Sequence, residues 1–144
     1  INDGKYGIGF DENTMSLSLL RATIRPDVTS DMGHHNFSYM IYPHENGAVE
    51  AGVNKLAFQF NEQLVKSDVS YNGDTFEPLY LQAMKDSEDG SMTVIRLSEQ
   101  DGKRGKIKLS KSVKLLDMLE NVIGEAVDTL EYKPFEIITI GIQK

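Results

Sequence analysis

The sequence contains no cysteine among its 144 residues. Without cysteine the chain forms no disulfide, and disulfides are typical of oxidising compartments. We therefore expect a cytoplasmic protein, with a secreted protein that lacks disulfides as the alternative.

Long apolar runs and targeting signals are also missing. No apolar stretch approaches the ~20 residues of a membrane-spanning helix, and no signal-peptide pattern is present, although a piece of a longer protein would have lost one. Internal repeats and low-complexity tracts are absent too, which argues against a solenoid or a flexible tail. We expect no membrane partner.

Positive charge is scarce, because 15 Lys and Arg face 22 Asp and Glu for a net charge of −7. A nucleic-acid-binding protein normally carries a basic stripe that neutralises phosphates, so we expect no nucleic-acid partner. The one basic cluster, residues 103–108, is typical of a solvated turn and edge strand, where lysines discourage strand association.

What is present is ordinary for a globular protein, with 40% hydrophobic and 26% charged residues. The length suits one domain or two small ones.

Polar residues 67–77 suggest a boundary between two units. The second unit reads as strands at 79–84, 92–98, 106–109, 113–119, 126–132 and 135–142. The last strand is apolar on both faces, which predicts a central position in its sheet.

The first unit holds the densest group of ionisable residues, between two alternating runs. Met15, Leu17 and Leu19 predict one strand, and residues 37–42 predict another, with a hairpin tip at 11–13 leading into the first. After them Val53, Leu56, Ala57 and Phe60 have helical spacing, which predicts a short helix over about 49–61. The polar middle of this stretch indicates a working loop. Its candidate site residues are Arg21, Asp27, Asp31, His34 and His35.

Several interpretations of this loop are open. Asp31, His34, His35 and His44 could bind a metal, but adjacent histidines in an extended segment point to opposite sides, so a loop hydrogen-bond network is favoured. Alternatively, Asp31 and one histidine face a sugar. Arg21 and Arg25 are expected to brace the loop by pairing with Asp27 or Asp31.

Six short blocks occur in order along the first unit, at residues 2–7, 17–22, 26–27, 31–35, 37–39 and 42–44. Together they resemble the C-terminal β-region of family 38 glycoside hydrolases, the α-mannosidases of bacterial and cytosolic type. Residues 94–99, 119–120 and 134–139 fit more loosely, so the resemblance spans almost the whole chain.

This resemblance implies an all-β fold of antiparallel β-sandwiches. Residues 1–66 would be the terminal part of a large mutarotase-like supersandwich, and residues 67–144 a small C-terminal β-sandwich. It also implies that the catalytic nucleophile, the acid/base and the zinc ligands lie in an N-terminal catalytic domain outside this sequence. The chain alone would then be inactive, with no catalytic residue and no metal or other cofactor of its own. The full-length enzyme would hydrolyse terminal α-mannosides with retention, and residues 21–35 could contribute to the rim of its active site.

The residues themselves give no evidence of catalysis. No Gly-x-Ser-x-Gly elbow is present, and sequence cannot show two carboxylates facing each other across a cleft. The aromatic side chains of the first unit could stack on a sugar ring, but at their spacing core packing is favoured. These aromatic residues are Phe37, Tyr39, Tyr42, Phe58 and Phe60.

Two expectations concern partners. The N-terminal catalytic domain is the expected partner, with mannosides as a further candidate, and the alternative is a free-standing carbohydrate-binding or protein-interaction sandwich. The resemblance also implies that residues 1–66 are incomplete alone. They would leave strand edges and an apolar face uncovered, to be covered by missing strands, an exchanged segment or a second copy in a homo-oligomer. That face is expected to carry Leu17, Leu19, Phe37, Tyr39 and Ile41.

Overall fold

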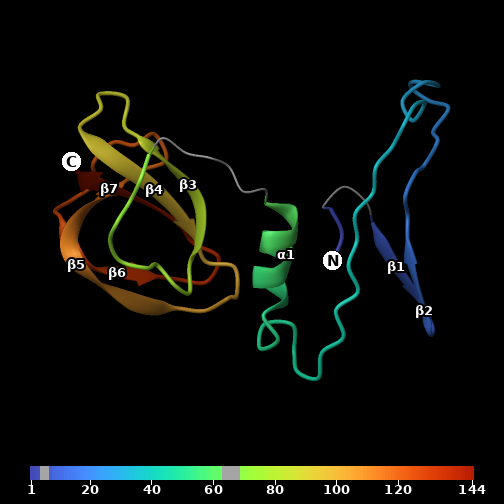
Figure 1. Ribbon diagram of the computed structural model, residues 1–144, viewed down its shortest axis with the longest axis horizontal. Coiled ribbons are helices and arrows are strands. Elements are labelled where there is room, and N and C mark those ends of the chain that lie inside the picture. The colour runs from blue at the N-terminus through green and yellow to red at the C-terminus, as the bar shows by residue number, and fades with distance from the viewer. Residues whose placement is uncertain (4–6, 63–68) are drawn as a thin grey trace. The chain divides into compact units, whose positions relative to one another are not determined.

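The computed structural model describes residues 1–3, 7–62 and 69–144, which form mostly β-structure with one short helix (Figure 1). The chain divides into two compact units, Ile1–Leu64 and Val65–Lys144. The boundary expected between Lys66 and Ser67 lies outside the described residues. No helix in the described part of the chain is long and apolar enough to cross a membrane.

The first unit begins with a hairpin of strands β1 (Ile8–Asp11) and β2 (Thr14–Leu17), paired antiparallel. Glu12 lies in the turn with a positive φ of 47°, so the predicted hairpin tip is confirmed. The strand is shorter than its alternating pattern suggested, because β2 ends at Leu17 and does not include Leu19.

The strand predicted over residues 37–42 is wrong. Only one bridge forms there, between Tyr39 and Asn2, with Met40 donating its N–H to the carbonyl of Ile1 at 2.8 Å. An alternating pattern makes a strand only where a neighbour offers a ladder of backbone groups. Residues 1–3 pair with this run at one bridge, with the Asp3 N–H donating to the carbonyl of Ser38 at 3.1 Å, and no ladder over residues 37–42 is formed.

The predicted helix is present but shorter, as α1 (Val53–Asn61). Gly52 precedes it with a φ of 68°, a left-handed conformation that glycine adopts easily and that interrupts a right-handed helix. Residues 48–52 therefore form turns. The helix ends where Glu62 adopts an extended conformation, with its N–H still bonded to the carbonyl of Phe58.

None of the described residues of the first unit is fully buried. Large apolar side chains are exposed, among them Phe10 at 78%. Of the apolar face expected to lack cover, Leu19, Tyr39 and Ile41 are exposed, while Leu17 and Phe37 are half-buried. The apolar side chains of this unit therefore do not form a core of their own.

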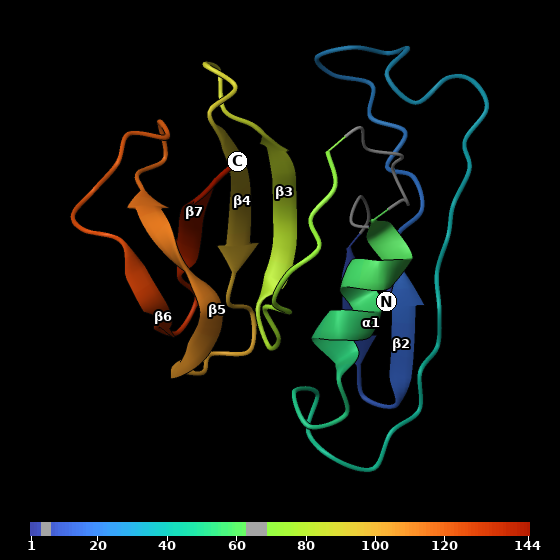
Figure 2. The ribbon, with the colours of Figure 1, turned by 60° about the vertical axis from the view of Figure 1, so that its left-hand side comes forward.

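The second unit is one five-stranded antiparallel sheet in the order β3-β4-β7-β5-β6 (Figure 2). Its strands are β3 (Tyr80–Asp86), β4 (Met92–Ser98), β5 (Gly105–Leu116), β6 (Val127–Tyr132) and β7 (Ile137–Gln143). The central place predicted for the last strand is confirmed.

The two strands predicted at 106–109 and 113–119 form a single strand, β5. Residues 110–112 contain neither glycine nor proline, so the chain continues through them with a register shift between Lys108 and Val113 instead of turning. The first part of β5 pairs with β6, and its last residues, 114–116, pair with β7. The sheet thereby folds over itself, consistent with a β-sandwich.

The core lies inside this fold. Leu97 and Ile140 are completely buried, and Ile95 and Leu130 are 1% exposed. Each such side chain contributes roughly 1.5–3 kcal/mol on removal from water. Strands β4 and β7 supply one wall of the core, and β5 and β6 supply the other.

A segment preceding β3 closes the edge of this sandwich. The Asp74 carboxylate accepts hydrogen bonds from both the backbone N–H and the hydroxyl of Ser110 in β5, each at 2.9 Å. Tyr71 and Phe76 stack with ring centroids 5.7 Å apart and pack against the core. Residues 71–79 thus belong structurally to the second unit.

Candidate functional site

The polar loop of the first unit encloses a hollow of about 280 Å³. It brings together three of the five predicted site residues, Arg21, Asp31 and His35. The other two, Asp27 and His34, are exposed and do not line it. The remaining lining residues, which sequence reasoning did not select, are Gly7, Ser18, Leu20 and Thr23.

Asp31 holds the loop in shape. Its Oδ2 accepts the backbone N–H of Ala22 at 2.5 Å, where the chain has a positive φ of 48°. Its carbonyl lies 3.1 Å from Nε2 of His35, whose ring stacks on that of Phe37 with centroids 6.2 Å apart. The favoured interpretation, a loop hydrogen-bond network, is confirmed for Asp31 and His35.

The arginine bracing expected of this loop is wrong. Within the described part of the chain, no ion pair joins Arg21 or Arg25 to a carboxylate. Asp27 instead accepts the N–H and hydroxyl of Thr29 at 2.8 and 2.7 Å, and these two hydrogen bonds lower the pKa of the Asp27 carboxyl. Backbone and hydroxyl donors two residues away satisfy the carboxylate without ordering a long arginine side chain.

The histidines are not grouped around a common point. His44 Nδ1 lies 2.6 Å from the carbonyl of Asn46, while His34 is exposed. Across residues 1–3, 7–62 and 69–144, no three His, Asp or Glu side chains are placed to hold a metal ion.

The hollow has the chemistry of a polar binding rim. Arg21 supplies a guanidinium donor, Asp31 a carboxylate acceptor, and Ser18 and Thr23 supply hydroxyls that can donate or accept. Such a mixture suits hydrogen bonds to the hydroxyl groups of a polyol. Nucleophilic catalysis would further need an activated nucleophile beside an oriented base, and the hydrogen bonds of these residues show no such pair.

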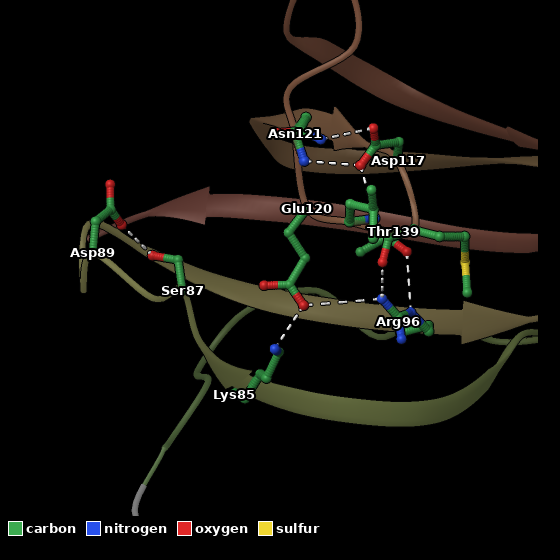
Figure 3. Close-up of polar contacts among 10 residues, drawn as sticks. Lys85, Ser87, Asp89, Arg96, Asp117, Glu120, Asn121 and Thr139 are labelled. Atoms are coloured by element: carbon green, nitrogen blue, oxygen red, sulfur yellow. Dashed lines mark hydrogen bonds and ion pairs between the residues drawn. The ribbon is translucent and has the colours of Figure 1, made fainter.

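A second polar cluster lies on the outer face of the other unit (Figure 3). Glu120 Oε1 lies 2.6 Å from Lys85 Nζ and 4.0 Å from Arg96 Nη2. Arg96 also donates to the hydroxyl of Thr139 at 3.2 Å and to the carbonyl of Met118 at 3.3 Å. Strands β3, β4 and β7 are thereby tied to the loop after β5.

That loop turns tightly around Asp117 (Figure 3). The Asp117 carboxylate accepts the N–H groups of Leu119 and Asn121 at 2.8 and 2.9 Å and the Asn121 side-chain amide at 3.0 Å. The hydrogen bonds from the Asn121 side chain and backbone lower the pKa of Asp117. None of these residues is among the predicted site residues, and their geometry indicates a structural clamp.

A third cluster centres on the buried carboxylate of Glu99, which is 4% exposed. It accepts four backbone N–H groups at 2.8 to 3.0 Å, from Asp101, Gly102, Lys103 and Phe135. Burial acts to raise the pKa of this carboxyl, but the four donors together outweigh it and hold the pKa below its usual value. A glutamate two residues before an Asp-Gly turn is the sequence signal that could have revealed this arrangement.

Part of the chain is similar in sequence to a known family. Residues 78–140 match the model described as glycosyl hydrolases family 38 C-terminal beta sandwich domain. Alpha-mannosidase G of Dictyostelium discoideum is 30% identical over 164 residues, and an alpha-mannosidase of Saccharomyces cerevisiae is 32% identical over 162 residues. Alpha-mannosidase 2C1 of Mus musculus is 46% identical over 65 residues. No solved structure matches the chain.

The extent of these matches is uneven. The first two alignments each cover 96% of this chain but only 15% and 14% of the relatives. The mouse alignment covers 45% of this chain and 6% of that protein. The chain therefore corresponds to a small part of each relative.

Proposed function

Because this chain belongs, through residues 78–140, to the family 38 C-terminal β-sandwich domains, we propose that it is the non-catalytic C-terminal β-region of an α-mannosidase. In this proposal the region supports an N-terminal catalytic domain of the same protein and contributes to carbohydrate binding. The observation that carries the proposal is the alignment of 96% of the chain with two proteins that are both named alpha-mannosidases.

The exposed apolar face of the first unit supports this reading. A groove of about 310 Å³ lies on it, with Ile8, Met15, Leu17, Tyr39 and Ile41 among its lining residues. An apolar surface of this kind is typical of a segment that packs against other parts of a protein. In the proposal, residues 1–66 are the terminal part of a large mutarotase-like sandwich whose other strands come from the catalytic side of the protein.

The proposed role of the polar loop is to form part of the active-site rim. Arg21, Asp31 and His35 would hydrogen-bond the hydroxyl groups of a mannoside, with Asp27 and His34 on the outer side of the same loop. Retaining hydrolysis needs two carboxyl groups about 5–5.5 Å apart, one as nucleophile and one as acid/base. The proposal assigns both groups, and the zinc site, to the catalytic domain.

Zinc is not assigned to this chain. A zinc site takes three or four N, S or O ligands in tetrahedral geometry, and no such set is assembled among the described residues. We propose the cytoplasm as the location, because a chain without cysteine forms no disulfide. Neither nucleic acid nor membrane is among the proposed partners.

The alternative function is a free-standing carbohydrate-binding or protein-interaction module. The core of the second unit favours it, because all the described residues of that core cluster come from residues 71–142. The two proposals differ in whether the gene encodes a catalytic domain before Ile1, which sequencing of the upstream reading frame would decide.

Site-directed variants of the intact protein test the rim assignment. We expect Arg21→Ala to raise KM for p-nitrophenyl α-mannoside, because a donor to the sugar is lost. The matched control is Arg25→Ala, since Arg25 does not line the hollow. Equal KM values for the two variants and the parent protein would remove Arg21 from the rim.

A further inference from the structure

The second unit presents a large aromatic ring to solvent on a strained backbone. Phe135 is 73% exposed and has a φ of 59°, a left-handed conformation that bulky residues rarely adopt. Such strain persists only where the surroundings enforce it. Exposed, strained residues of this kind cluster at binding sites.

The enforcing group is the buried Glu99 carboxylate. It accepts the Phe135 N–H at 2.8 Å and, through its two oxygens, the N–H groups of residues 101–103. One carboxylate thus joins the turn after β4 to the turn before β7. The Phe135 ring lies over the first of these turns, because a Cβ built on Gly102 would fall 3.2 Å from Phe135 Cζ.

Neutral hydrogen-bonding groups lie at the same end of the sheet. Tyr80, Ser98 and Ile137 are cross-strand neighbours on β3, β4 and β7, so they form one row on the outer face. The side-chain amides of Gln82 and Gln100 both donate to the Ser98 hydroxyl, at 2.8 and 3.0 Å.

A β-bulge brings Gln82 to this row. The register of β3 shifts between Leu81 and Ala83, so Gln82 is the extra residue, and its amide reaches Ser98 on the outer face. Bulges commonly re-aim a side chain in this way. The result is an array of two amides joined through the buried Ser98 hydroxyl. Beside it lie Tyr80, whose hydroxyl is next to the Asp101 carboxylate, and an apolar side chain, Ile137, that is 55% exposed.

We propose that Phe135, Tyr80, Gln82, Gln100 and Ile137 form a carbohydrate-contact surface on the second unit, separate from the polar loop of the first. An aromatic face packs on the C–H groups of a pyranose, while amides and hydroxyls bond its neutral hydroxyl groups. The occupant is a mannose-containing oligosaccharide. The surface is inferred from the positions of these side chains. Only the choice of mannose as the sugar rests on the proposed function.

The test is a ¹H–¹⁵N NMR titration of the full 144-residue chain with α-1,2-mannobiose to about 50 mM, far above a dissociation constant of ~1 mM that a single shallow sugar site would give. We expect saturable shifts of the amides of residues 80–82, 98–102 and 135–137. Phe135→Gly should abolish them, because glycine tolerates the backbone angle while the ring is lost. Phe135→Tyr should retain them. The matched control, Phe10→Ala, removes an equally exposed aromatic from the first unit and should change nothing.

Three results would overturn the inference: no shifts, shifts confined to residues 18–35, or shifts that follow protein concentration instead of sugar. The second would locate sugar binding at the loop, and the third would make Phe135 an anchor for another protein surface. Failure of the proposed function is a different result, namely an intact protein without mannosidase activity, and it would leave saturable shifts at Phe135 standing.

Discussion

The backbone N–H of Phe135 lies 2.8 Å from Oε2 of Glu99, across 36 residues of sequence. This contact connects the turn before the central strand β7 with the turn after its neighbour β4. The same carboxylate accepts the N–H groups of residues 101–103. The conformations of both turns therefore depend on the Glu99 side chain.

Glu99→Gln tests that dependence. The neutral amide has one acceptor oxygen in place of two, so buried N–H groups lose their partner, and we expect the second unit to lose about 1–3 kcal/mol of unfolding free energy at pH 7. Urea unfolding followed by circular dichroism measures the change. An unchanged midpoint would show that the four hydrogen bonds are not important for stability.

The same pair of proteins should differ in pH dependence. The folded-state pKa of Glu99 is lowered from 4.5, so its charge contributes stability above pH 4.5 that is lost as the pH falls through the folded pKa. Between pH 7 and pH 3 the parent protein should therefore lose more stability than Glu99→Gln does. Parallel curves for the two proteins would contradict the linkage.

Gly102→Ala tests the packing of the Phe135 ring. Alanine at a φ of 72° costs about 1–2 kcal/mol in backbone strain, and its Cβ would press on the ring at 3.2 Å. Gly90→Ala is the matched control, with a φ of 71° and no heavy atom within 4 Å of the added Cβ. We expect Gly102→Ala to be the more destabilising by thermal unfolding, and equal shifts would exclude the ring contact.

Leu97→Ala tests the core of the sandwich. Leu97 is completely buried, so its truncation should cost about 2–5 kcal/mol through lost burial and the cavity left behind. Leu119, which is 84% exposed, provides the control, and Leu119→Ala should change stability by less than about 0.5 kcal/mol. A similar loss in both variants would mean that the apolar tip at Leu119 is packed in solution.

The two units should respond differently to protease. The first unit has no buried residue in its described part, while the second contains the core, so limited trypsin digestion should leave a resistant C-terminal piece after early cleavage between Asn61 and Asp74. Alternatively, light scattering should show an oligomer that covers the apolar face. A compact monomer that resists protease evenly would show that residues 1–66 complete their own core.

The local sequence pattern was sufficient to predict most strands of the second unit. Its strands alternate and are separated by turns such as Asp89-Gly90. The adjacent residues Ile137 and Ile138 point to opposite faces of β7, so both faces carry apolar groups and the strand is marked as central. The exception was β5, because the polar residues Ser110 and Lys111 suggested a turn between two strands. Strand continuity there depends on pairing with β6 on one side and β7 on the other, which no local pattern shows.

The first unit was less predictable because its strands depend on partners. Phe37, Tyr39 and Ile41 alternate as a strand should, yet only Tyr39 has a bridge partner in the described structure. At the loop, the sequence identified Asp31 and His35 correctly as members of a hydrogen-bond network but could not foresee that Ala22, a neighbour only through the turn, supplies a donor. Contacts across a loop follow from backbone angles, such as the positive φ of Ala22, that composition does not determine.

The central claim, that this chain is the non-catalytic part of an α-mannosidase, is tested most directly by hydrolysis of p-nitrophenyl α-mannoside. The assay compares the isolated 144-residue chain with the intact protein encoded by its gene, each with and without added zinc. We predict turnover by the intact protein and none by the chain under either condition. Turnover by the purified chain that disappears when one of its own Asp or Glu residues is mutated would contradict the account.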